Sequence, residues 1–77
     1  MPELVLYYFE SCPFCQKVLR YLKKRGIEVT LKNTHQDQEA KKELIEVGGK
    51  YQVPCLFIDG EPLYESDDII QWFEDNY

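Results

Sequence analysis

The chain has 77 residues, with 14 acidic and 9 basic side chains and a net charge of −5. This length fits one domain, close to the smallest size whose core is adequate without disulfides or metal, and the negative charge disfavours binding to nucleic-acid phosphates. No apolar run approaches the roughly 20 residues that span a bilayer, and no basic region precedes the apolar start of the chain. We therefore expect a cytoplasmic domain with no membrane segment or signal peptide.

The first part of the chain predicts a strand, a helix and a second strand. Residues 4–9 form an apolar run typical of a strand buried on both faces. Apolar residues then recur at helical spacing from Cys15 to Leu22, and Gly26 can cap a helix over residues 13–25. Apolar and polar residues alternate over 27–32, which predicts the second strand. Short connections on either side of the helix predict that the two strands are parallel.

A second helix is expected after a polar loop over residues 33–37. Its apolar face is narrow and ends before two glycines, so this helix should be the more exposed and mobile one. The apolar positions are Ala40, Leu44, Ile45 and Val47.

The last third of the chain predicts a hairpin and a third helix. A strand over 53–58, the turn residues Asp59 and Gly60, and a strand over 61–64 form the hairpin. Ser66 is expected to cap the final helix, whose first turn carries acidic residues that the helix dipole favours. Its expected buried face comprises Ile69, Ile70, Trp72 and Phe73. The order β-α-β-α-β-β-α predicts an α/β fold, a four-stranded mixed sheet with helices on both faces.

Cys12 and Cys15 form a closely spaced pair at the junction between the first strand and the first helix. The chain has three cysteines, which cannot all pair with one another, and this argues against a secreted disulfide framework. At a helix N-terminus, unsatisfied N–H groups and the positive end of the dipole stabilise a thiolate. Cys12 is therefore the candidate nucleophile, and Pro13 stiffens the turn beside it. Cys15, about one turn along the helix, can attack a mixed disulfide on Cys12.

Other interpretations of the cysteine pair stay open. A zinc site needs two further ligands, for which Cys55 and His35 are the candidates, but His35 falls in a polar loop and is more simply a surface residue. A purely structural dithiol is a second alternative, although a reducing cytosol favours redox chemistry. Glu10 opposes thiolate formation if its carboxylate points at Cys12, and is otherwise a solvated loop residue.

Three short motifs follow one another along the chain: CPFC after the first strand, QVP before the third, and SDD at the start of the last helix. In this order and at this length, they resemble a dithiol glutaredoxin of the thioredoxin fold over essentially the whole chain. CPFC differs from the common CPYC form only by a phenolic hydroxyl. The resemblance implies a glutathione-dependent thiol–disulfide oxidoreductase that reduces protein disulfides and glutathione mixed disulfides, in which Cys12 attacks and Cys15 resolves the intermediate.

The resemblance also implies where the co-substrate glutathione would bind. Phe14 would flank it, Pro54 would be cis, and the backbone of Val53 would pair with the cysteine of glutathione. Backbone N–H groups at Ser66 would take the γ-glutamyl carboxylate, and Asp67 would take its ammonium. The implied partners are glutathione and disulfide-containing or glutathionylated proteins; we expect a monomer that binds no metal, nucleic acid or membrane.

Some features depart from the glutaredoxin pattern. Many members carry a lysine shortly before the first cysteine, in the region where Glu10 stands here, and Lys17 or a residue of the second helix could supply that cation instead. Cys55 is expected to be a small buried hydrophobe, with an extra redox thiol as the alternative. The segments CPFCQKV and YESDDI also resemble the N-terminal domain of some glutathione transferases, in which a pair such as Glu65 and Ser66 binds the γ-glutamyl group.

Two alternative functions follow from these departures and from the cysteines. Loss of the cationic contact near Glu10 would suit an electron donor served by thioredoxin reductase rather than by glutathione. The other alternative is a binding module in which two protomers share an iron–sulfur cluster through Cys12 and glutathione, although the stiff turn at Pro13 disfavours it.

Overall fold

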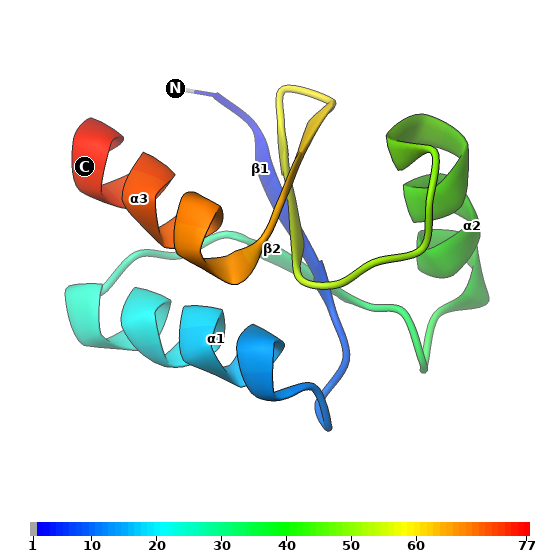
Figure 1. Ribbon diagram of the computed structural model, residues 1–77, viewed down its shortest axis with the longest axis horizontal. Helices are drawn as coiled ribbons and strands as arrows, with labels where there is room; N and C mark the ends of the chain where they lie inside the picture. The colour runs from blue at the N-terminus through cyan, green and yellow to red at the C-terminus, as the bar shows by residue number, and fades with distance from the viewer. Residues whose placement is uncertain (1) are drawn as a thin grey trace.

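The computed structural model describes residues 2–77 as one sheet flanked by three helices (Figure 1). The sheet has the strand order β2-β1-β3-β4, in which β1 is parallel to β2 and antiparallel to β3, and β3 is antiparallel to β4. The strands are β1 (Leu4–Tyr8), β2 (Thr30–Asn33), β3 (Cys55–Ile58) and β4 (Glu61–Tyr64). The helices are α1 (Pro13–Arg25), α2 (Gln38–Gly48) and α3 (Ser66–Asn76). The predicted four-stranded mixed sheet and the α/β class are confirmed.

The helices cover opposite faces of the sheet, with α1 and α3 side by side on one face and α2 on the other (Figure 1). Alternate side chains of β1 enter two separate cores, because successive residues of a strand point to opposite faces. The α1/α3 core contains Leu4, Leu6, Val18, Leu22, Leu56, Ile69 and Phe73. The α2 core contains Tyr7, Ala40, Leu44, Cys55 and Phe57. The expectation that the first strand is buried on both faces is thus confirmed.

Several predicted boundaries shift for physical reasons. β2 begins at Thr30 rather than at residue 27, because Ile27 and Val29 pack against the α1/α3 core from the connecting segment. Leu31 on this edge strand is 49% exposed, so the alternating pattern did not mark a buried face. β3 begins after Pro54, which has no N–H to donate to a neighbouring strand.

The apolar faces of α2 and α3 are narrower than the sequence predicted. In α2 only Ala40 and Leu44 are buried, whereas Ile45 and Val47 are exposed, consistent with the expectation that this helix is the more exposed one. In α3 the fully buried apolar residues are Ile69 and Phe73; the neighbouring Ile70 and Trp72 are half-buried against the same core.

The predicted cap of α3 is wrong by one residue. Ser66 is the first helical residue, and the cap position is held by Glu65, whose side chain makes no capping hydrogen bond. Glu65 has φ of 74°, in the left-handed region that non-glycine residues seldom adopt. A strained, uncapped helix start is a feature that functional sites often retain.

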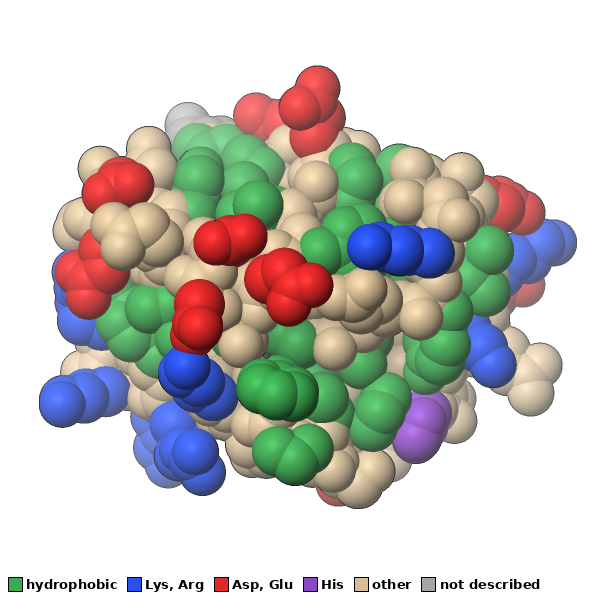
Figure 2. Space-filling model, in the orientation of Figure 1, with side chains coloured by type: hydrophobic (Ala, Val, Ile, Leu, Met, Phe, Trp, Pro, Cys, Tyr) green, Lys and Arg blue, Asp and Glu red, His purple; other side chains and the backbone are tan. Residues whose placement is uncertain are grey.

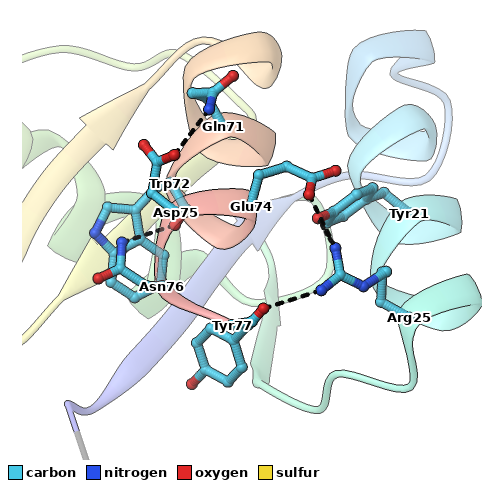
Figure 3. A network of polar contacts seen from close by, with 8 residues as sticks. All are labelled: Tyr21, Arg25, Gln71, Trp72, Glu74, Asp75, Asn76 and Tyr77. Atoms are coloured by element: carbon cyan, nitrogen blue, oxygen red, sulfur yellow. Dashed lines mark hydrogen bonds and ion pairs between the residues drawn. The ribbon is translucent and has the colours of Figure 1, made fainter.

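The far ends of α1 and α3 are tied together by Arg25 (Figure 3). Its guanidinium donates to the Tyr21 hydroxyl at 2.7 Å, to the Glu74 carboxylate at 3.2 Å and to a backbone oxygen of Tyr77 at 3.1 Å. This cluster lies at the end of α1 that is opposite to Cys12, so it holds the helix pair in place without entering the cysteine site.

No helix among residues 2–77 is both long and apolar enough to cross a membrane.

Candidate active site

Cys12 occupies the N-cap of α1 and is almost buried, with 7% of its surface exposed. Its backbone is extended, with φ of −85° and ψ of 116°, and its sulfur accepts a hydrogen bond from the Cys15 N–H at an N···S distance of 3.4 Å. Pro13 at the start of the helix brings no N–H of its own to the cap. The Cys12 sulfur therefore lies at the positive end of the α1 dipole and accepts a hydrogen bond from a backbone N–H of the first turn.

Cys15 lies beside Cys12 but in a different environment. Its side chain is fully buried in the first turn of α1. Burial raises the pKa of the Cys15 thiol to about 12, the hydrogen bond and charge of Cys12 act in the same direction, and a backbone hydrogen bond with Phe9 partly opposes them. Cys15 is thus a protonated thiol at neutral pH, adjacent to the sulfur that faces the helix end.

A bend in front of β3 lies against the Cys12 sulfur. The Val53–Pro54 peptide bond is cis, as the resemblance implied for Pro54. The Cys12 thiol donates to the Val53 carbonyl oxygen at 4.0 Å, a long sulfur contact. The Val53 N–H donates to no acceptor within residues 2–77. An extended peptide lying beside this bend could therefore pair with the Val53 backbone in the manner of an added strand.

A groove of about 330 Å³ runs from this bend to the start of α3. We call it the active-site groove; it is lined by Phe14, Gln52, Val53, Pro54, Glu65, Ser66 and Asp67. It brings together every residue that the sequence assigned to glutathione. Phe14 is 63% exposed, so its ring forms an apolar wall that is open to solvent. A larger hollow of about 760 Å³ lies along α2 but includes none of these residues.

Gln52 and Glu65 close one side of the active-site groove, and sequence reasoning gave Gln52 no role. Its side-chain amide donates to the Glu65 carboxylate at 2.9 Å. The contact links the bend before Pro54 to the uncapped start of α3. The QVP motif contained Gln52, but its spacing to Glu65 is set by the hairpin β3–β4 and is not visible in the sequence.

The first turn of α3 offers backbone N–H groups to the active-site groove. The first intrahelical donor is the Ile69 N–H, which bonds to the Glu65 carbonyl oxygen at 3.0 Å. The preceding N–H groups of the helix have no intrahelical acceptor, as in any α-helix. Figure 2 shows acidic side chains gathered around this end of α3; they include Glu65, Asp67 and Asp68.

The chain is similar to proteins of two related groups. The family model described as glutathione S-transferase, N-terminal domain, matches residues 6–77. A probable glutaredoxin of Synechocystis sp. is 32% identical over 68 residues, covering 87% of this chain and 77% of that protein. Glutaredoxin 1 of Rickettsia prowazekii is 33% identical over 69 residues, covering 86% and 72% respectively.

The chain belongs to the glutaredoxin family. The crystal structure of a thioredoxin-like protein superposes with a TM-score of 0.76 at 24% identity, covering 90% of this chain and 97% of that one. The fold is therefore thioredoxin-like. The match of residues 6–77 to the N-terminal domain of glutathione S-transferases shows that this glutaredoxin-family chain also belongs with those domains, as YESDDI indicated.

Glu10 stands in the region where the resemblance implied a lysine. Glu10 is exposed in the turn, where its backbone oxygen accepts from the Gln16 side chain at 2.8 Å, and its carboxylate forms no ion pair within residues 2–77.

Phe9 stacks on His35, with ring centroids 4.0 Å apart and planes 8° apart. His35 is thus exposed but held against the cysteine turn, a contact for which the sequence gave no signal. In the described part of the chain, no cluster of three or more His, Cys, Asp or Glu residues is placed to hold a metal ion.

Cys55 lies on the other side of the sheet from α1. It is fully buried in the α2 core, and burial raises the pKa of its thiol to about 11. A backbone hydrogen bond with Leu63, a hydrogen bond with Tyr64 and the charge of Lys50 only partly oppose that rise. Cys55 therefore behaves as the small buried hydrophobe that was expected.

Proposed function

We propose that this glutaredoxin-family protein is a glutathione-dependent thiol–disulfide oxidoreductase that reduces glutathione mixed disulfides and protein disulfides. The observation that carries the proposal is the position of Cys12 at the N-cap of α1, next to the Val53–Pro54 bend and the active-site groove. The proposed activity requires reduced glutathione, so we propose that the protein works in the cytoplasm. We also propose that it is a monomer.

In the first step, the Cys12 thiolate attacks the glutathione sulfur of a glutathionylated protein. The bond between that sulfur and the protein substrate breaks, the substrate leaves as a thiolate that takes up a proton, and a Cys12–glutathione disulfide remains. The Cys15 N–H and the end of α1 face the Cys12 sulfur before this step.

The second step has two routes. A second glutathione thiolate can attack the glutathione sulfur on Cys12, which releases oxidised glutathione and restores the Cys12 thiolate. Alternatively, Cys15 loses its proton and attacks Cys12, which expels glutathione and leaves a Cys12–Cys15 disulfide that two glutathione molecules then reduce. Because burial raises the pKa of the Cys15 thiol, we expect the first route to dominate at neutral pH.

Glutathione would lie in the active-site groove in an extended conformation. Its cysteine would pair with the free Val53 N–H, and the Phe14 ring would cover its apolar surface. The N–H groups at the start of α3 would take the γ-glutamyl carboxylate, and Asp67 would take the ammonium. All these groups line one groove, which supports binding of a single extended tripeptide.

The test compares two sources of electrons for the same substrate. A glutathionylated peptide is incubated with the protein and either glutathione with glutathione reductase and NADPH, or thioredoxin reductase with NADPH. We expect turnover with glutathione and little with thioredoxin reductase alone. Turnover only with thioredoxin reductase would overturn the glutathione assignment and favour the electron-donor alternative.

A further inference from the structure

Lys17 lies on α1, beyond the cysteine pair, and reaches across to the active-site groove. Its ammonium forms an ion pair with one carboxylate oxygen of Asp67, the second residue of α3. The side chain of Lys17 is 50% exposed and that of Asp67 is 80% exposed. The ion pair therefore stands at the rim of the groove, within reach of a bound ligand.

The active-site groove is short of positive charge. Its lining includes the carboxylates of Glu65 and Asp67 but, among residues 2–77, no basic side chain. An anionic group entering the groove would be repelled by both carboxylates, and the N–H groups of one helix end offset this only partly. Lys17 forms an ion pair with one residue of the groove lining, Asp67.

Both residues of the ion pair, Lys17 and Asp67, keep hydrogen-bonding positions that a ligand can use. A carboxylate offers about four acceptor positions on its two oxygens, and an ammonium offers three donors. Lys17 uses one oxygen of Asp67, so the second oxygen can accept from another ammonium and Lys17 can donate to another carboxylate. A cation and an anion side by side match the two charges of an α-amino acid group.

We propose that Lys17 is a specificity-determining residue that binds the α-carboxylate of the γ-glutamyl group of glutathione, while Asp67 binds the adjacent ammonium. This inference rests on the proposed function. It supplies, from α1, the positive charge that the turn before Cys12 lacks at Glu10. The ion pair then selects ligands that carry both charges over ligands that carry only one.

Three peptide mixed disulfides test the assignment by removing one charge of the ligand at a time. One carries glutathione, one carries γ-aminobutyryl-cysteinylglycine, which lacks the α-carboxylate, and one carries glutaryl-cysteinylglycine, which lacks the amine. KM and kcat are measured for each with the wild-type protein and with Lys17→Gln. The reductant is held constant and saturating.

We expect Lys17→Gln to raise KM about fivefold for the glutathione and glutaryl substrates, which is at the upper end for a half-exposed ion pair. KM for the γ-aminobutyryl substrate should stay the same or fall, because that ligand has no α-carboxylate to lose a contact. The kcat values should not change, since Lys17 does not touch the sulfur atoms. Lys17→Arg should restore the wild-type KM because it keeps the charge.

Lys24→Gln is the matched control, since Lys24 is an exposed lysine of the same helix that forms no ion pair within residues 2–77. It should leave all three KM values unchanged. An unaltered KM for the glutathione substrate in Lys17→Gln, or an equal rise for the γ-aminobutyryl substrate, would overturn the inference while leaving the proposed function intact. If the wild-type protein turned over none of the three substrates, both would fall.

Discussion

The two faces of the sheet carry cysteines in contrasting environments. On the α1 side, Cys12 sits at a helix end and receives a backbone hydrogen bond on its sulfur. On the α2 side, Cys55 is enclosed by apolar and aromatic side chains within a strand. The same side chain thus meets backbone donors at one position, whereas burial raises the pKa of its thiol at the other.

The two cysteines differ in their local hydrogen-bond donors rather than in burial. Cys12 is nearly as buried as Cys55, with 7% and 0% of the surface exposed. What separates them is the end of α1, whose N–H groups and dipole act on one sulfur only. The active-site groove is also lined by Val53, whose carbonyl oxygen contacts the Cys12 sulfur, whereas Cys55 lines no part of the groove.

Removing the proposed nucleophile, Cys12, should have the largest effect. We expect Cys12→Ser to lower kcat/KM for a glutathionylated peptide by at least about 10³-fold, because the nucleophile of the first step is lost. The rate is measured with glutathione, glutathione reductase and NADPH. Cys55→Ser serves as the comparison variant and should remain active wherever it stays folded. Substantial activity in Cys12→Ser would assign the chemistry to another thiol.

Removing the neighbouring cysteine should separate the two substrate classes. Cys15→Ser should keep reduction of the glutathionylated peptide within about twofold of wild type, since glutathione itself completes the second step. Reduction of an intramolecular protein disulfide should fall by at least about tenfold, because the thiol that resolves the mixed disulfide is missing. Equal losses on both substrates would show that the route without Cys15 does not operate.

Alkaline pH should destabilise the fold through its buried thiols. An unfolded thiol has a pKa near about 8.5, whereas burial raises the pKa of Cys55 to about 11 and that of Cys15 to about 12. The native state therefore keeps its protons longer than the unfolded state. The contribution of these thiols to the free energy of unfolding is fully present below about pH 8.5. Above that pH, each thiol lowers the free energy of unfolding by up to about 1.4 kcal/mol per pH unit.

Denaturant unfolding of the reduced protein between pH 7 and pH 10.5 measures this fall. Cys55→Ala should show a shallower loss of the free energy of unfolding than wild type, because one of the two buried thiols is gone. Parallel curves for the two proteins would show that Cys55 ionises equally easily in both states.

The smallest effect is expected for Cys55→Ala at neutral pH. Loss of the buried sulfur should lower the free energy of unfolding by about 1 kcal/mol, which is typical of a small core deletion. The activity on a glutathionylated peptide should not change, since Cys55 lies in the α2 core. A clear fall in kcat without loss of stability would link Cys55 to the reaction and weaken the contrast between the two faces.

Local patterns predicted most of the fold. The residues of α1 follow from the apolar spacing and from Gly26, whose φ of 68° suits a glycine cap. The residues of β4 follow from the turn at Gly60. Predictions failed where packing decides: Leu31 belongs to an edge strand, and Val47 of α2 faces outward.

The candidate site was predictable in composition but not in its contacts. The spacing of the cysteine pair brought out Cys12, whereas the family resemblance implied Pro54 and Asp67. These residues lie far apart in the chain and are brought together only by the fold. The ion pair of Lys17 with Asp67 spans 50 positions, and the hydrogen bond of Gln52 with Glu65 crosses the hairpin. The first contact depends on how α1 packs against α3 and the second on the β3–β4 hairpin, and a single sequence carries no periodic signal for either.

Trapping the first intermediate tests the central claim most directly. Reduced Cys15→Ser protein is mixed with a glutathionylated peptide without added glutathione, and the site of modification is located by peptide mass spectrometry. Our account predicts one glutathione per protein, attached to Cys12, with the peptide released as a free thiol. Glutathione on Cys55, or the peptide rather than glutathione attached to Cys12, would contradict it.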